Sequence, residues 1–338
     1  MSRRRDPIER SAEETDDLYD VSTWEPRSVV DRFSYGLYWG INAGLHVIVL
    51  LVALVITVYL FFSPALVVAQ DPIVSAFFAL SIVPALLLAG YIWYADITTN
   101  EPLGLLVATF VLAMLFATFA AVLNTIGGLA FDTATIVGAA LFFYLIVGPV
   151  EETVKLLAVR VLAYRSKTFD AVIDGAVYGA VAGLGFAAIE NAMYIASHVA
   201  EVDSGASLLS AATGIATVRA LAGPGHVIYS AIAGYYLGLA KFNPQYAGPL
   251  IVKGLLIASV VHGTYNVTVQ IVPGYLAATY PISGDVAFVG YVIAFDLAIG
   301  YYLYRKITRY RRTYRRIRAD ADGADHAPEL TEFEPSQR

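Results

Sequence analysis

Two adjacent glutamates and a lysine interrupt an apolar stretch of the sequence, "GPVEETVKLLAVR" at residues 148–160. In a helix Lys155 shares a face with Glu151 and Glu152, because residues three and four positions apart are neighbours. If this run crosses a membrane, each charged side chain costs on the order of 3 kcal/mol on insertion scales. Lys155 neutralises one carboxylate, and the other needs a proton, an imidazole, a metal ion or water. This pattern favours a functional site over a structural brace.

More polar side chains recur in the apolar runs that follow. In "GFAAIEN", Phe186 and Glu190 are four residues apart and Asn191 is adjacent. A spacing of four places two residues on one helix face, and the same spacing joins each of two later histidines to a serine or an asparagine. The candidate site residues in these runs are Asp174, Phe186, Glu190, Asn191, His226, Ser230, His262 and Asn266. Two histidines on separate runs, together with three glutamates, indicate a shared polar site.

These residue types suit hydrolysis of a peptide bond without a covalent intermediate. A glutamate can take a proton from water, imidazoles can hold that water, and an asparagine amide can donate hydrogen bonds to the developing oxyanion. Alternatively, His226, His262 and Glu190 could hold a catalytic zinc ion with one open position. The helix-borne H-E-x-x-H signature is absent, which weakens the metal interpretation. The sequence leaves a zinc-assisted and a metal-free mechanism open.

The composition indicates the elements that must position these residues. Of the 338 residues 58% are hydrophobic and 15% are charged, and twenty of the fifty Asp, Glu, Lys and Arg residues lie between Phe33 and Tyr304. A membrane-embedded body at 33–304 is therefore expected between an N-terminal tail at 1–32 and a basic, then acidic, C-terminal tail at 305–338. The absence of cysteine excludes disulfides, thiolate metal sites and a cysteine nucleophile.

Apolar runs close to the roughly 20 residues that cross a bilayer occur eight times. They fall at about 36–62, 73–95, 103–125, 134–162, 171–198, 212–240, 249–271 and 286–304. Turn-forming residues separate them. The sequence predicts an all-α, polytopic membrane protein with about eight transmembrane helices and a catalytic cavity between helices four to seven. Within the sixth run, Pro224 of "GPG" predicts a kink or a helix break.

The basic residues predict the orientation of these runs. Six arginines precede the first run, Arg165 and Lys167 follow the fourth, Lys241 follows the sixth, and "RKITRYRRTYRRIR" follows the eighth. Loops rich in Lys and Arg stay in the cytoplasm. We therefore expect a multi-pass protein of the cell membrane with both termini cytoplasmic, surrounded by lipid and without a nucleic-acid partner.

Four motifs, in this order and spacing, closely resemble the PrsW family. They are "EETVK", an E-E-x-x-K element, "FAAIE", an F-x-x-x-E element, and the segments "HVIYSAIAGYYLG" and "HGTYN". The resemblance covers Val147 to Val267. PrsW proteins are intramembrane proteases, distantly similar to the CAAX prenyl proteases and to bacteriocin-immunity relatives. The resemblance implies an endopeptidase whose substrates are membrane-anchored proteins such as anti-sigma factors.

The resemblance also implies roles for the glutamates. Glu151 and Glu152 match the paired glutamates that activity requires, with Glu151 as the base that activates water and Lys155 as the basic partner. Glu190 occupies a position where the CAAX proteases are expected to carry a histidine, which is a departure from their pattern.

The remaining site residues follow from the same resemblance. His226 and His262 would orient the water or bind a metal ion, and Asn266 would donate to the oxyanion.

Two other function classes also fit the sequence. A proton-coupled transporter places Glu, Lys and His near the membrane midplane in helices interrupted by Gly and Pro. Against it, no inverted repeat is visible and the polar residues concentrate in the second half of the chain. A non-catalytic immunity or scaffold relative would keep the fold and would tolerate Glu151→Gln.

Overall fold

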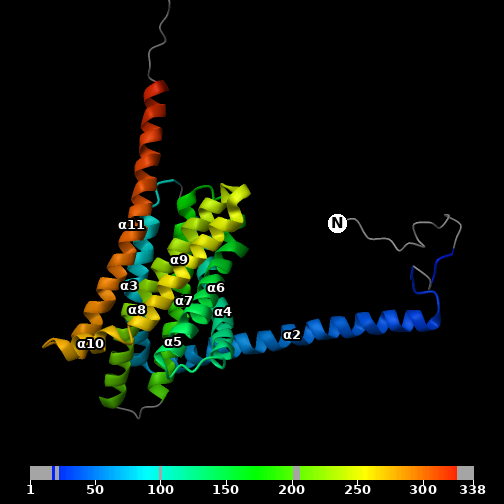
Figure 1. Ribbon diagram of the computed structural model, residues 1–338, viewed down its shortest axis with the longest axis horizontal. Helices are drawn as coiled ribbons and strands as arrows, with labels where there is room; N and C mark the ends of the chain where they lie inside the picture. The colour runs from blue at the N-terminus through cyan, green and yellow to red at the C-terminus, as the bar shows by residue number, and fades with distance from the viewer. Residues whose placement is uncertain (1–16, 20–22, 99–100, 201–205, 326–338) are drawn as a thin grey trace, which may run out of the picture. The chain divides into compact units, whose positions relative to one another are not determined.

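The computed structural model describes residues 17–19, 23–98, 101–200 and 206–325, and their regular structure is helical (Figure 1). The only β-pairing among these residues is a single bridge between Tyr19 and Thr23. The elements are α2 (Val29–Gln70), α3 (Pro72–Tyr94), α4 (Leu103–Gly128), α5 (Ile136–Phe142), the π-helical turn η1 (Phe143–Val147), α6 (Gly148–Val161), the 3₁₀ turn η2 (Ala163–Arg165), α7 (Val172–Ala200), α8 (Ala206–Lys241), the 3₁₀ turn η3 (Pro244–Tyr246), α9 (Ala247–Thr268), α10 (Val272–Thr279) and α11 (Gly284–Asp325). The predicted all-α class is confirmed.

The chain divides into two compact units, Met1–Val58 and Tyr59–Arg338, and the division falls inside α2. In the first unit the apolar side chains of α2, such as Leu45, Leu51 and Val55, are exposed. The second unit contains α3 to α11 and every residue of the candidate site.

Seven helical segments of the described residues are long and apolar enough to cross a membrane. They are Leu51–Gln70, Pro72–Tyr94, Leu103–Gly128, Ile136–Arg165, Val172–Ala200, Pro244–Thr268 and Gly284–Ala319. Each overlaps one of the eight predicted runs, which confirms the polytopic architecture. The first segment lies later than the predicted 36–62.

The remaining predicted run, 212–240, lies in α8, which is 36 residues long but is absent from the seven apolar segments. From Val227 to Ala240 almost every side chain of α8 is buried or nearly so. The helix packs against α3, α7, α9 and α11. A helix enclosed by protein can carry Gly, Ser and His, because lipid does not contact those residues.

The structure differs from the prediction at three other places. The helix α8 continues through Pro224, so of the predicted kink or break the break is absent. Residues 63–70, predicted as part of a turn, extend α2 to Gln70, and Asp71 then caps α3 by accepting from the N–H groups of Ile73 and Val74. The predicted loop after the seventh run contains the helix α10.

Helix α7 forms the centre of the second unit. In the most apolar 18-residue stretch of α7, 89% of the residues are buried. The helix packs against α3, α4, α6 and α8. The glycines spaced by four residues explain how close α8 comes. A Cβ added at Gly175, Gly179 or Gly183 would lie 2.2–2.3 Å from a backbone oxygen of α8. This stripe therefore sets the distance between the two helices.

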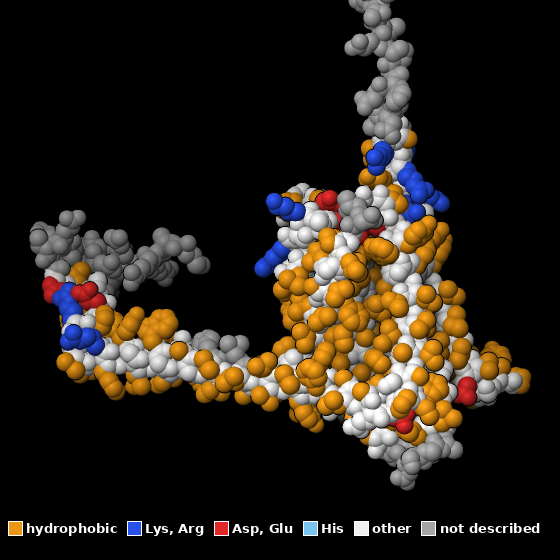
Figure 2. Space-filling model, turned by 180° about the vertical axis from the view of Figure 1, so that it is seen from behind, with side chains coloured by type: hydrophobic (Ala, Val, Ile, Leu, Met, Phe, Trp, Pro, Cys, Tyr) orange, Lys and Arg blue, Asp and Glu red, His pale blue; other side chains and the backbone are white. Residues whose placement is uncertain are grey.

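The protein surface matches a membrane environment. Figure 2 shows hydrophobic side chains over the sides of the helical body that contains α3 to α11, with Lys and Arg side chains gathered at one end of it. Exposed large apolar residues of this body include Leu87, Leu256 and Leu297. Such a surface is expected where lipid tails replace water.

Candidate active site

A cavity of about 590 Å³ opens between α4, α6, α7, α8 and α9. Its walls include Glu151, Glu190, His226, His262 and Asn266. These five residues come from four helices, so the tertiary structure brings together most of the side chains that the sequence singles out as catalytic.

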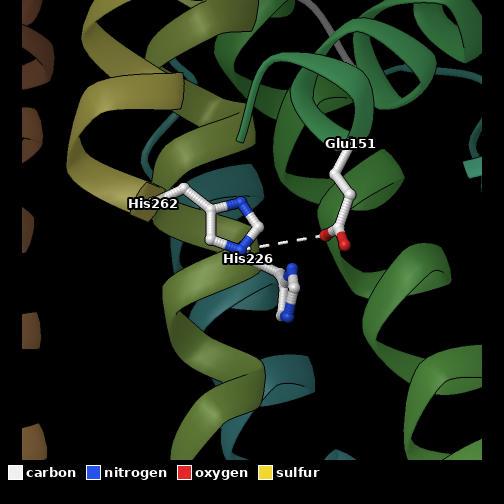
Figure 3. A group of neighbouring side chains, drawn as sticks. All are labelled: Glu151, His226 and His262. Carbon is white, nitrogen blue, oxygen red and sulfur yellow. Dashed lines mark ion pairs between the residues drawn. The ribbon is translucent and has the colours of Figure 1, made fainter. Parts of the chain in front are cut away.

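Glu151 and His262 face each other across this cavity. Glu151 is the third residue after the start of α6, which follows directly on the π-helical turn η1, and turns of this kind are frequent at functional sites. Its Oε1 accepts a hydrogen bond from Asn124 Nδ2 at 3.0 Å, whereas its Oε2 is buried and accepts no hydrogen bond from any described residue. This oxygen lies 3.8 Å from Nε2 of His262, and Figure 3 shows the two side chains pointing toward each other, joined by a dashed line.

Glu152 holds His262 from the other side of the imidazole. Its Oε1 lies 2.8 Å from Nδ1 of His262 and 2.6 Å from the Lys155 ammonium, and both side chains of the Glu152–Lys155 pair are fully buried. Ser230 Oγ donates to the other carboxylate oxygen at 3.4 Å. A carboxylate at Nδ1 fixes the proton there, so the lone pair of Nε2 points toward Glu151.

Comparisons with known proteins identify the family of the chain. A family model described as PrsW family intramembrane metalloprotease matches residues 101–298, which is more than half of the chain. The chain belongs to the PrsW family. It is therefore an intramembrane protease.

Curated relatives agree with the family assignment. Protease PrsW of Bacillus subtilis (strain 168) is 29% identical over 199 residues, covering 56% of this chain and 81% of the relative. Protease PrsW of Oceanobacillus iheyensis is 30% identical over 185 residues, covering 55% and 79%. Protease PrsW of Clostridioides difficile (strain 630) is 27% identical over 199 residues, covering 57% and 79%. No solved structure matches the chain.

In this PrsW chain Lys155 connects the paired glutamates to the second histidine. The ammonium lies 2.6 Å from Glu152, 3.8 Å from Glu151 and 2.9 Å from Nδ1 of His226. A lysine ammonium only donates, so Nδ1 of His226 accepts and its Nε2 carries the proton. The ring of Phe186 completes the enclosure, with its centroid 4.2 Å from the ammonium and its plane stacked on His226.

Glu190 is held by a cation that the sequence analysis did not place in the site. Its Oε2 lies 2.6 Å from Arg219 Nη2 and 2.8 Å from Nε2 of His226. Arg219 Nε also donates to Asn191 Oδ1 at 2.9 Å, and Asn191 in turn donates to Ser81 Oγ at 3.0 Å. Glu190 is thereby neutralised, and Asn191 serves to position the guanidinium.

The metal ligands predicted from the sequence were His226, His262 and Glu190. In the structure the three donors that lie within 4.8 Å of one another are Glu151, His226 and His262. Glu151 Oε2 accepts no hydrogen bond from the described residues and lies beside Nε2 of His262, which makes this the better fit, because two histidines and a glutamate are a ligand set of catalytic zinc. Both ring nitrogens of His226 already have partners, so its entry into a metal shell requires one partner to leave.

Two residues complete the comparison with the sequence prediction. Asp174 lies outside this cavity, at the beginning of α7, where it meets Asp96 and Glu101. Asn124, which contacts Glu151, was missed. Its only signal in the sequence is a single amide near the end of an apolar run, which is too common a feature to identify a site.

Proposed function

We propose that this PrsW protein hydrolyses peptide bonds of membrane-anchored proteins with a water molecule activated by Glu151. The observation that carries the proposal is the pair Glu151 Oε2 and His262 Nε2, which lie 3.8 Å apart on side chains that line the cavity, with no hydrogen bond to Glu151 Oε2 from the described residues. Hydrogen bonds to water measure roughly 2.7–3.2 Å, so one water molecule can bridge both atoms. That water is held beside the space that a peptide would enter.

The proposed reaction follows from these positions. Glu151 takes a proton as the water oxygen attacks the peptide carbonyl carbon, and the carbonyl oxygen becomes an oxyanion. Asn266 lines the same cavity one helical turn after His262 and is the proposed donor to that oxyanion. Glu151 then returns the proton to the leaving amine as the carbon–nitrogen bond breaks.

A divalent metal ion such as zinc fits the same residues. Glu151, His226 and His262 would hold it, and a bound zinc ion lowers the pKa of its water toward neutrality. Glu152 and Lys155 would keep their role, since Glu152 holds Nδ1 of His262 and Lys155 holds Nδ1 of His226.

We further propose that the basic end of the helical body faces the cytoplasm and that both termini lie there. The support is the positive-inside rule applied to the Lys and Arg side chains that gather at this end (Figure 2). The lipid bilayer then surrounds the apolar sides of the body.

The proposal is tested by cleavage of a single-span, membrane-anchored substrate by the full chain purified in detergent. Wild type is compared with Glu151→Gln, His262→Ala and Asn266→Ala. His198→Ala is the matched control, because His198 is an exposed histidine at the end of α7. We expect Glu151→Gln and His262→Ala to lower kcat by at least about 100-fold, since a positioned acid–base group contributes that much or more.

A second arm separates the two forms of the mechanism. Treatment with a zinc chelator should stop cleavage, and added zinc should restore it in wild type but not in His262→Ala. Cleavage by Glu151→Gln at the wild-type rate would refute the role given to Glu151. Cleavage that resists the chelator would instead support the metal-free form.

A further inference from the structure

Three carboxylates outside the active site converge at one end of the helical body. Asp96 follows the last residues of α3, Glu101 precedes the beginning of α4, and Asp174 lies in the first turn of α7. One oxygen of each lies within 4.8 Å of the other two. The three side chains come from segments up to 78 positions apart in the sequence, so the fold alone makes this cluster.

The oxygens of this cluster are incompletely satisfied. Glu101 is only 4% exposed, and neither of its carboxylate oxygens has a hydrogen-bond partner among the residues that the structure describes. Asp96 Oδ2 also has none, although its Oδ1 accepts from the N–H and the hydroxyl of Thr98. Asp174 Oδ2 accepts hydrogen bonds from the backbone N–H groups of Asp170 and Ala171. Its Oδ1 has only a long hydrogen bond from Thr98 Oγ1, at 3.5 Å. A buried carboxylate oxygen without a partner costs free energy.

No cationic side chain resolves this accumulation of charge. In the parts of the chain that the structure describes, no Lys or Arg nitrogen lies within 4.0 Å of these three carboxylates. Lys241 directs its ammonium to the carbonyl oxygens of Tyr164 and Ser166.

A proton and a metal ion would relieve the cluster to different extents. One shared proton bridges two oxygens, so at least one unpartnered oxygen and two negative charges would remain. A divalent cation contacts all three carboxylates at once and cancels two of the charges. Sites built only from oxygen select hard cations, whereas zinc prefers nitrogen and sulfur.

We propose that Asp96, Glu101 and Asp174 bind a hard divalent cation, Mg²⁺ or Ca²⁺, at the ends of α3, α4 and α7. The bound ion ties the C-terminal end of α3 and the N-terminal end of α4 to α7, the helix that also carries Glu190. This site is separate from the Glu151–His262 pair and does not depend on the hydrolytic mechanism.

The test uses Mn²⁺ as a paramagnetic probe with the full chain in detergent, freed of metal by chelator and desalting. Electron paramagnetic resonance measures free Mn²⁺ during titration, and Mg²⁺ and Ca²⁺ are added as competitors. Asp96→Asn/Glu101→Gln removes the proposed ligands. Asp132→Asn/Asp285→Asn is the matched control, because both of those carboxylates are exposed. His262→Ala reports on Mn²⁺ bound at the active site.

We expect wild type, the control and His262→Ala to retain a Mn²⁺ site that Mg²⁺ or Ca²⁺ displaces. Asp96→Asn/Glu101→Gln should bind Mn²⁺ at least about tenfold more weakly, since affinity follows the number of charged ligands. In chelator this variant should have a higher Tm than wild type, because like charges are removed, and Mg²⁺ and Ca²⁺ should leave its Tm unchanged. Equal binding by all proteins, or no binding by wild type, would overturn the proposal.

Discussion

Glu152 Oε1 lies 2.8 Å from Nδ1 of His262, while Glu151 Oε2 lies 3.8 Å from Nε2 of the same ring. Adjacent residues of one helix thus contact opposite nitrogens of one imidazole. Lys155 and Ser230 donate hydrogen bonds to both oxygens of Glu152. Glu151 lines the cavity, and its Oε2 accepts no hydrogen bond from the described residues. The pair "EE" therefore divides into a carboxylate that orients and a carboxylate that is available for chemistry.

Glu152→Gln should destabilise the protein and slow cleavage. The change leaves the buried Lys155 ammonium without its closest carboxylate, which costs about 3 kcal/mol in the free energy of unfolding. It also loosens His262, and loss of such an orienting carboxylate typically lowers activity about 10- to 100-fold. Thermal unfolding and kcat measure the two effects.

The double variant Glu152→Gln/Lys155→Met separates them. Removing both charges should recover most of the lost stability, because neither member of the Glu152–Lys155 pair is then left as a buried charge without the other. The loss of kcat should persist. A single variant as stable as wild type would contradict the buried ion pair.

Arg219→Lys should destabilise the protein although the charge is kept. The guanidinium binds Glu190 through Nη2 and Asn191 through Nε, and a lysine ammonium cannot reproduce this two-point geometry. We expect a loss of about 2 kcal/mol, the range for hydrogen bonds to charged groups. Arg160→Lys is the control, because Arg160 is exposed, and it should stay within about 0.5 kcal/mol of wild type in thermal unfolding.

Gly183→Ala should affect both packing and catalysis. The added Cβ would lie 2.3 Å from the backbone oxygen of His226, so α7 and α8 must separate there. Overpacking of this kind costs about 1–3 kcal/mol, and a displaced His226 should lower kcat as well. Gly214→Ala is the control, since an added Cβ there meets no atom within 4 Å. Equal Tm and kcat in the two variants would disprove the close contact.

The metal content of the purified protein should identify the ligand set. We expect about one zinc ion per chain by elemental analysis of protein prepared without chelator. Glu151→Gln and His262→Ala should lose the zinc ion, because each removes one of the three ligands, Glu151, His226 and His262, whose donor atoms lie within 4.8 Å of one another. Glu190→Gln should keep it, since Glu190 is engaged by Arg219. Zinc lost from Glu190→Gln but kept in Glu151→Gln would instead support the ligand set predicted from the sequence.

The sequence identifies most of the site because charged residues are costly in apolar helices. For that reason alone the sequence singles out Glu151, Glu152, Lys155, Glu190, His226 and His262. The sequence does not assign Arg219 to Glu190, nor Asn124 to Glu151, because those contacts join separate helices. The sequence also groups Asp174 with the catalytic residues. It indicates that an acidic residue near an apolar run is costly to bury, but it does not indicate which residues surround that side chain in the fold.

The sequence by itself determined the all-α membrane architecture, the order of the apolar runs and the residue types of the active site. These follow from local properties, namely helical periodicity, the length of each run and the cost of burying charge. The tertiary structure decided that Glu152 is tightly paired with Lys155 whereas Glu151 Oε2 accepts no hydrogen bond from the described residues, and that Asp174 belongs to a different cluster. Glu151 and Glu152 are adjacent and chemically identical, so only the neighbours that other helices supply can distinguish them.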